Sequence, residues 1–197
     1  RPMLRIVLLS LGVVLLLALI AAPIVLAPRE VAADTNPILP IAEAEQAAII
    51  EAMRPPKRAR PVIAIVARNE GTEITDFLVS YGVLKRADVA DVFVVAERAE
   101  TVRLYPSLAV EPDLSFAAFD ERFPEGADYL VIPAMDPGTD PAIADWIMRQ
   151  HRNGAKVVSV CNGSRMAGTA GLLHGRRATG HWSAIEELRA KYPTMEY

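Results

Sequence analysis

The fold is decided by the stretch Lys156-Val157-Val158-Ser159-Val160-Cys161-Asn162-Gly163-Ser164. Its first five residues are typical of a strand buried in a parallel sheet. Cys161 falls where this strand gives way to a helix. The small residue Ser159 before it and Gly163 after it match the small-x-nucleophile-x-Gly pattern of a nucleophile elbow. Ligands of open α/β sheets bind at the carboxyl ends of the strands, so this pattern predicts a functional thiol there.

The start of a helix directly after Cys161 also predicts how the thiol ionises. Backbone N–H groups at a helix start favour the thiolate, so we expect the pKa of Cys161 to be lowered. The alternative is a small buried hydrophobic residue, which is the commoner role of a lone cysteine.

Strand and helix patterns alternate outward from this stretch, beginning at Pro61. Buried strands are predicted at residues 62–67, 91–95, 129–133 and 156–160. Helices are predicted at residues 73–87, 141–153, 165–172 and 183–191, with Asp140 as the N-cap of the second. A hairpin is predicted from residues 101–105 and 108–110, and a short strand at 177–179. This alternation predicts an α/β fold with a mostly parallel sheet and helices on both faces.

Composition excludes several classes of function. The net charge of −3, from 21 basic and 24 acidic residues, gives no basic field for nucleic acid. A single cysteine in 197 residues excludes an intrachain disulfide framework and any Cys-rich zinc or iron–sulfur site. We therefore expect no nucleic-acid partner, no metal and no other cofactor.

The N-terminal segment Ile6–Ala27 has 22 residues without a charge. As a helix it would span about 33 Å, enough to cross the bilayer core, and we expect a transmembrane anchor. The alternative is a secretory signal peptide cleaved near Val31-Ala32-Ala33. Arg1 and Arg5 before the segment favour a single-pass protein with its N-terminus inside and its domain outside the cytoplasm.

Residues 28–60 are expected to form a linker with one short helix, at 41–53. The linker ends in a basic cluster made of Arg54, Lys57, Arg58 and Arg60. This cluster either contacts anionic lipid or is simply solvated. The folded domain is expected at residues 61–197.

The motif around the cysteine resembles the ThiJ/PfpI (DJ-one/PfpI) family, whose domains have a class I glutamine-amidotransferase-like fold. The resemblance rests on residues 157–164 and on 170–182, which read Ala-Gly-Leu-Leu-His-Gly-Arg-Arg-Ala-Thr-Gly-His-Trp. It is strongest to the amidase-like domains of AraC-type regulators. It implies a flavodoxin-like α/β sandwich, often dimeric, which continues past Tyr197. On this basis the domain is expected to be incomplete at its C-terminus.

The resemblance also implies partners for Cys161. Family members place an acidic residue on the first helix, against the sulfur, and Asp76 falls at that position. His181 matches a family histidine that would act as a base toward the cysteine. The alternatives are a solvent-facing Asp76, with Glu73 as its competitor, and a structural His181 packed beside Trp182.

The expected substrate site is formed by Asn162, Gly163, Ala134 and Met135. Many family members have a Gly-Gly pair after the strand that corresponds to Tyr129–Ile132, and the backbone amides there form an oxyanion site. This chain departs from that pattern, with Pro133-Ala134-Met135 at the same place. The His-x-Glu pair of glutamine amidotransferases is absent, which leaves glutamine hydrolysis unsupported.

Two functions follow from these patterns. The first is a membrane-tethered domain whose Cys161 acts on a small electrophile, such as an isonitrile or a reactive carbonyl. Such an enzyme would be a cysteine-dependent hydrolase or a hydratase/lyase. The second is a non-catalytic module that senses a ligand or redox state, like the amidase-like halves of AraC-type regulators. Both functions require a small-molecule ligand, and the resemblance allows a homodimer.

Overall fold

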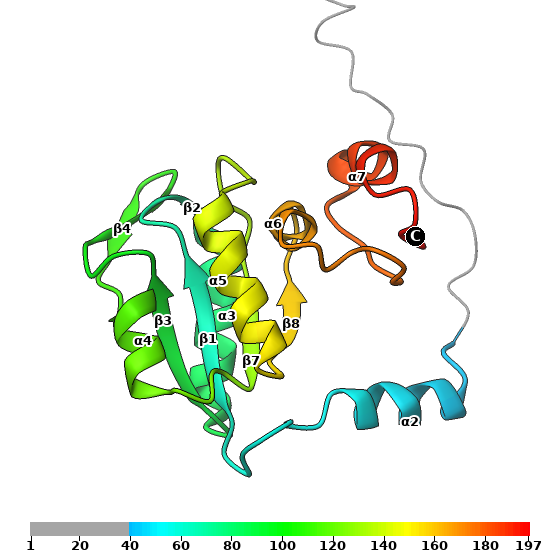
Figure 1. Cartoon of the computed structure of the whole chain (residues 1–197), viewed down its shortest axis with the longest axis horizontal. Helices are drawn as coiled ribbons and strands as arrows, with labels where there is room; N and C mark the ends of the chain where they lie inside the picture. Colours follow the sequence, from blue (N-terminus) through cyan, green and yellow to red (C-terminus); the bar gives the residue numbers. More distant parts are fainter. Residues whose placement is uncertain (1–39) are drawn as a thin grey trace, which may run out of the picture. The chain divides into compact units, whose positions relative to one another are not determined.

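Five parallel strands form the central sheet, in the order β6-β3-β1-β7-β8 (Figure 1). The strands are β1 (Val62–Ala67), β3 (Asp91–Ala96), β6 (Leu114–Ser115), β7 (Tyr129–Ile132) and β8 (Lys156–Ser159). All six residues of β1 are buried, which explains the continuous apolar run. The order β3-β1-β7-β8 is the 2-1-3-4 order of flavodoxin-like folds, so the predicted fold class is confirmed.

The structure is a computed structural model and describes residues 40–197. The predicted anchor, Ile6–Ala27, lies outside these residues. Between residues 40 and 197, no helix has the length and the apolar character needed to cross a bilayer.

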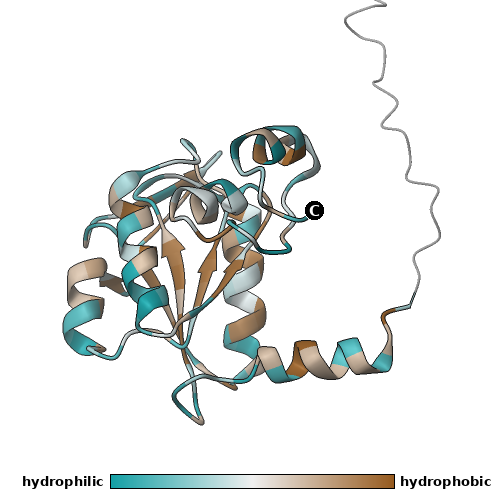
Figure 2. Cartoon of the chain, turned by 45° about the vertical axis from the view of Figure 1, so that its right-hand side comes forward, coloured by the Kyte–Doolittle hydropathy of each residue, from teal (hydrophilic) through white to brown (hydrophobic). Residues whose placement is uncertain are grey.

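Helices cover both faces of the sheet. On one face, α3 (Ile74–Ala87) packs through the fully buried Phe77 against β1 and β3. The opposite face carries α4 (Phe116–Arg122), α5 (Pro141–Arg152), α6 (Gly163–Thr169) and α7 (Ile185–Lys191), which share one core cluster. Figure 2 shows the strands in the brown of apolar residues, between helices whose outer faces are hydrophilic.

A small second sheet lies beside the carboxyl end of β1. It has the order β2-β4-β5 and consists of β2 (Glu70–Glu73), β4 (Val102–Tyr105) and β5 (Leu108–Val110). The predicted hairpin is confirmed as β4 and β5, which pair antiparallel. β2 leads directly into α3, which places the first turn of α3 near the carboxyl ends of the central strands.

Several predicted boundaries differ from the structure. The helix predicted at 165–172 is α6, which begins at Gly163 and ends at Thr169. The strand predicted at 177–179 is wrong, since only a single bridge joins Arg177 to Glu196. The helix predicted at 183–191 divides into the 3-10 turn η1 (Trp182–Ala184) and α7. The linker helix is α2 (Glu43–Ala52), and none of its residues is buried.

The end of the linker is held by the folded domain through the buried carboxylate of Asp128. Its Oδ1 accepts hydrogen bonds from the backbone N–H groups of Lys57 (3.0 Å) and Arg58 (3.2 Å). Its Oδ2 accepts from the backbone N–H of Val62 (2.9 Å) and from the Arg58 guanidinium (2.7 Å). Burial opposes ionisation of Asp128, but these hydrogen bonds and the charge of Arg58 hold its pKa below the usual value.

Two residues of the basic cluster, Lys57 and Arg58, are half-buried against the domain, whereas Arg60 stays exposed at its surface. The ammonium group of Lys57 donates to the carbonyl oxygens of Glu125 and Ala127. Arg60 pairs with the carboxylates of two aspartates that flank the start of β3, Asp88 and Asp91. These positively charged side chains bind groups of the domain itself. Their partners lie far away in the sequence, so the sequence of the linker alone could not show these contacts.

Candidate functional site

Cys161 lies at a sharp turn between β8 and α6. Its φ of 55° is in the left-handed region, which a residue with a side chain adopts only under local strain. The turn is held by two backbone hydrogen bonds, from Val160 N–H to the Ile132 carbonyl (2.9 Å) and from Gly163 N–H to the Val160 carbonyl (2.8 Å). The predicted elbow geometry is therefore present.

Gly163 is required at this turn for a steric reason. A Cβ at this position would lie 2.0 Å from the carbonyl oxygen of Ile132. Real Cβ atoms do not approach a carbonyl oxygen so closely. The glycine thus allows the elbow to pack directly against the end of β7.

Asp76 lies in the first turn of α3, facing the elbow. Its Oδ2 accepts a hydrogen bond from the backbone N–H of Ala134 (3.1 Å), just beyond the end of β7. The same carboxyl group acts on the Cys161 thiol, as a negative charge and as a hydrogen-bond acceptor, and thereby raises the pKa of the thiol. The structure brings Asp76, Ala134 and Cys161 together from three segments, and the solvent-facing alternative for Asp76 does not apply.

Burial raises the pKa of the Cys161 thiol above its ordinary value. The backbone N–H of Asn162 acts in the opposite direction, because it donates to the sulfur and favours the thiolate. The charge of Asp76, its hydrogen-bond acceptor and the charge of Glu73 also favour the neutral thiol, and together with burial they outweigh that donor. The expected lowering of the pKa is therefore wrong in direction.

Glu73 acts as the N-cap of α3, as its sequence position suggested. Its carboxylate accepts hydrogen bonds from the backbone N–H of Asp76 (2.7 Å) and the hydroxyl of Thr75 (2.7 Å). Burial opposes its ionisation, but these donors hold the pKa of Glu73 below its usual value. A fixed negative charge therefore lies near the thiol, and sequence reasoning did not anticipate its effect on the sulfur.

His181 is connected to the elbow through its backbone. Its N–H donates to the carbonyl oxygen of Cys161 (3.2 Å). Its imidazole Nδ1 instead meets the hydroxyl of Ser183 (2.7 Å) and accepts from the Ser183 N–H (3.3 Å), which caps η1. The ring also packs beside Trp182, with centroids 5.1 Å apart. These contacts fit the structural alternative for His181 and give no support to its predicted role as a base.

The expected substrate site is only partly available. The N–H of Ala134 is occupied by Asp76, and its carbonyl accepts from the N–H of Glu73 (2.8 Å). Met135 forms an antiparallel bridge with Thr72. The side-chain Oδ1 of Asn162 is buried without a hydrogen-bond partner in the protein. The amide of Ala134 is thus committed to positioning Asp76 rather than to an oxyanion.

Residues 61–197 match the model of the DJ-1/PfpI family. The chain belongs to the DJ-1/PfpI family. Solved relatives include a ThiJ/PfpI family protein from Pseudomonas syringae (TM-score 0.59, 21% identity, 80% of this chain and 62% of that chain) and Schizosaccharomyces pombe DJ-1 (TM-score 0.55, 20% identity, 66% and 73%). At these identities the likeness shows the fold alone.

Two curated relatives of this DJ-1/PfpI chain carry names that indicate a function. One is the HTH-type transcriptional regulator CdhR of Pseudomonas aeruginosa, 35% identical over 77 residues, which are 38% of this chain and 23% of the regulator. The other is the isonitrile hydratase of Pseudomonas putida, 48% identical over 44 residues, which are 22% of this chain and 19% of that enzyme. The chain thus spans about a fifth of the length of either relative.

The site of this DJ-1/PfpI domain is built from one thiol, one carboxyl group and backbone amides. Within residues 40–197, no group of three or more His, Cys, Asp or Glu side chains is arranged to hold a metal ion. Sequence reasoning missed Ser164, a fully buried residue whose hydroxyl donates to the Cys161 carbonyl (3.1 Å). The position of Ser164 directly after Gly163 was the sequence feature that could have identified it.

Proposed function

We propose that this DJ-1/PfpI domain uses Cys161 as a nucleophile toward a small electrophile, such as an isonitrile or a reactive carbonyl compound. The observation that carries the proposal is the placement of the Asp76 carboxyl group, held by the Ala134 N–H, beside the strained turn of Cys161, whose pKa it raises. A thiol with a raised pKa needs a base at the moment of attack, and the carboxyl group of Asp76 is the side chain on the neighbouring segment that acts on this pKa.

The proposed step transfers one proton and forms one bond. The sulfur attacks the electrophilic carbon while the S–H proton passes to the carboxylate of Asp76. The π electrons of a carbonyl compound move to its oxygen, whereas in an isonitrile the electron pair remains on the terminal carbon that the sulfur has attacked. That oxygen or carbon then takes the proton back from Asp76, so the carboxylate is regenerated and a neutral covalent adduct remains on Cys161.

One of the named relatives, the isonitrile hydratase, supports a small electrophile as the substrate class. The isonitrile hydratase is 48% identical in sequence to this chain over 44 residues. The direct test is to incubate the purified chain with methyl isonitrile or methylglyoxal and to follow consumption of the reagent. We expect turnover that is absent in Cys161→Ser and falls about 100-fold in Asp76→Asn, because general base catalysis contributes at least that factor. Equal consumption by the Cys161→Ser variant would exclude a nucleophilic thiol.

A non-catalytic sensing module is the second candidate, and two observations favour it. The regulator CdhR is 35% identical in sequence to this chain over 77 residues. The Ala134 amide, expected at an oxyanion site, is occupied by Asp76. A sensor would bind the same compounds without consuming them and would keep this binding in Cys161→Ala. Calorimetry with the intact chain and the variant separates the two functions.

We also propose that the domain is tethered to a membrane, on the outer side, by the uncharged segment Ile6–Ala27. The support is the sequence alone: 22 residues without a charge, preceded by Arg1 and Arg5. The full chain is expected to sediment with membranes and to resist carbonate washing, while removal of residues 1–33 releases the domain. Full-length protein found only in the soluble fraction would refute the tether.

A further inference from the structure

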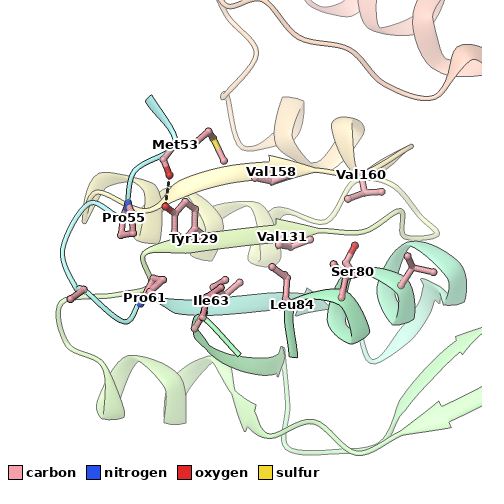
Figure 3. Close-up of a pocket in the computed structure, with 15 residues that line it drawn as sticks. Met53, Pro55, Pro61, Ile63, Ser80, Leu84, Tyr129, Val131, Val158 and Val160 are labelled. Carbon is pink, nitrogen blue, oxygen red and sulfur yellow. Dashed lines mark hydrogen bonds between the residues drawn. The ribbon is translucent and has the colours of Figure 1, made fainter. Parts of the chain in front are cut away.

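The backbone carbonyl of Cys161 is held by two donors from different parts of the chain. Directly after β8, Val160 leads the chain into the turn at Cys161 (Figure 3). The Cys161 carbonyl oxygen accepts from the hydroxyl of Ser164 (3.1 Å) and from the backbone N–H of His181 (3.2 Å). Neither hydrogen bond belongs to the regular ladder of a helix or a strand, so both act on the turn itself.

The orientation of this carbonyl also determines where the next backbone N–H points. Cys161 and Asn162 are joined by a planar trans peptide, in which the C=O of the first residue and the N–H of the second point in opposite directions. The Asn162 N–H is the backbone donor that acts on the Cys161 sulfur and favours its thiolate. Fixing the carbonyl on one side of the peptide therefore fixes the donor to the sulfur on the other.

The turn needs this restraint because its backbone is strained. The φ of Cys161 is 55°, in the left-handed region that residues with a side chain rarely adopt. Such a conformation persists only where the surrounding contacts hold it in place. Ser164 is fully buried, so its hydroxyl is shielded from bulk water that would compete for the hydrogen bond.

Gly180 allows both donors to reach the carbonyl. A Cβ at this position would lie 2.5 Å from the Oγ of Ser164 and 3.1 Å from its Cβ. Because Gly180 directly precedes His181, a side chain here would either rotate the Ser164 hydroxyl away or push the His181 N–H back. The two hydrogen bonds thus depend on one close approach, between the start of α6 and the segment before η1.

We propose that Ser164 is a positioning residue: its hydroxyl holds the Cys161 carbonyl so that the Asn162 N–H points at the reacting sulfur. The inference rests on the proposed nucleophilic function and adds a residue that acts through the backbone of the elbow. A helical serine often donates to a carbonyl of the preceding turn as a purely local feature. Here the accepting carbonyl belongs to the nucleophile and lies outside α6, which links the hydrogen bond to the thiol.

The test measures the rate of Cys161 alkylation by iodoacetamide against pH in the intact chain. The sulfur bonds to the CH₂ carbon while iodide leaves with its electron pair, and the thiol proton passes to solvent. Cys161 is the only cysteine, so a single mass increment reports the reaction. The inflection of the rate gives the pKa of the thiol, which a loss of stability alone would not move.

We expect Ser164→Ala to move the inflection upward by about half a pH unit, because the donor to the sulfur is then held by one contact instead of two. The thiolate fraction at neutral pH would fall about threefold. Gly180→Ala should move the inflection upward by at least as much, since it displaces one donor or both. Adding Ser164→Ala to Gly180→Ala removes the closest clash, so the double variant should shift no further than Gly180→Ala alone.

Thr169→Ala is the matched control, because the Thr169 hydroxyl also donates to a backbone carbonyl of α6, that of Arg165 (2.9 Å), away from the elbow. It should leave the inflection in place. The charges of Asp76 and Glu73, which act on the thiol, are present in every variant. An inflection that is unchanged or lower in Ser164→Ala overturns the positioning role, and so does an equal shift in the control. Failure of iodoacetamide to alkylate the native wild type at any pH would instead refute the proposed function.

Discussion

Replacing Asp128 with Asn tests whether the linker end is a structural part of the domain. The carboxylate of Asp128 accepts four hydrogen bonds, two on each oxygen. An Asn side chain keeps one acceptor oxygen and turns its NH₂ group toward two of these donors. Two donors that lose their acceptor, one of them on a guanidinium, lower the free energy of unfolding by about 3 kcal/mol.

Urea denaturation followed by tryptophan fluorescence measures this loss, because Trp146 is fully buried in the core. With a slope of about 2 kcal/mol per molar urea, the midpoint should fall by about 1.5 M. Asp91→Asn is the control, since its half-exposed pair with Arg60 contributes at most about 1 kcal/mol. An Asp128→Asn midpoint within about 0.3 M of the wild type would refute the assigned structural role.

The same pair of proteins gives a pH dependence with a definite sign. The pKa of Asp128 in the folded state lies below its usual value of 3.8. The stabilisation is therefore complete above that value and is lost as the pH falls through the lower pKa of the folded state. The difference in stability between wild type and Asp128→Asn should be constant near neutral pH and shrink below pH 3.8. A difference that grows in acid would contradict the ionised, paired state of Asp128.

Three further predictions concern the elbow. Asp76→Asn removes a negative charge and an acceptor beside the thiol, so the inflection of the Cys161 alkylation rate against pH should move to lower pH; an upward shift would contradict the contact. Gly163→Ala should lower the free energy of unfolding, measured by heat or urea, by at least about 2 kcal/mol, because the added Cβ clashes with a backbone carbonyl. Gly82→Ala is the control: nothing lies within 4 Å of the added Cβ, so it should raise the free energy of unfolding by up to about 1 kcal/mol through the higher helix propensity of alanine. His181→Ala should change the alkylation rate of Cys161 less than about twofold, and a loss of tenfold or more would restore the histidine as a base.

The sequence predicted the parts of the fold that rest on local patterns. The uninterrupted apolar run of β1 and the helical spacing of α3 identified those elements. Asp140 capped α5 as expected, with its carboxylate accepting from the N–H groups of Ala142 and Ile143. In contrast, β2 has the polar sequence Glu-Gly-Thr-Glu and β6 has only two residues, so neither shows a period that could be recognised.

The properties of the site depended on contacts that no local pattern encodes. The elbow motif located Cys161, but the direction of its pKa depends on burial and on the carboxylate of Asp76. The orientation of that carboxylate in turn depends on the N–H of Ala134, which belongs to a third segment. His181 was recognisable from its motif, whereas its bond to Ser183 was not. Sequence patterns therefore located the residues better than they predicted their ionisation.

The attachment of Lys57 and Arg58 to Asp128 also determines how the domain bears mechanical load. These residues lie at the amino ends of β1 and β7, whereas Cys161 follows the carboxyl end of β8. A pull on the chain before Ala52 first loads the hydrogen bonds that the Ala52 and Arg54 carbonyls accept from the Lys156 ammonium and that the Met53 carbonyl accepts from the Tyr129 hydroxyl. It reaches the Asp128 hydrogen bonds only after these, and the elbow lies about 16 Å further along β8. Tension on the chain ahead of the domain would therefore strain contacts at the amino ends of the strands before it disturbed the turn that carries Cys161.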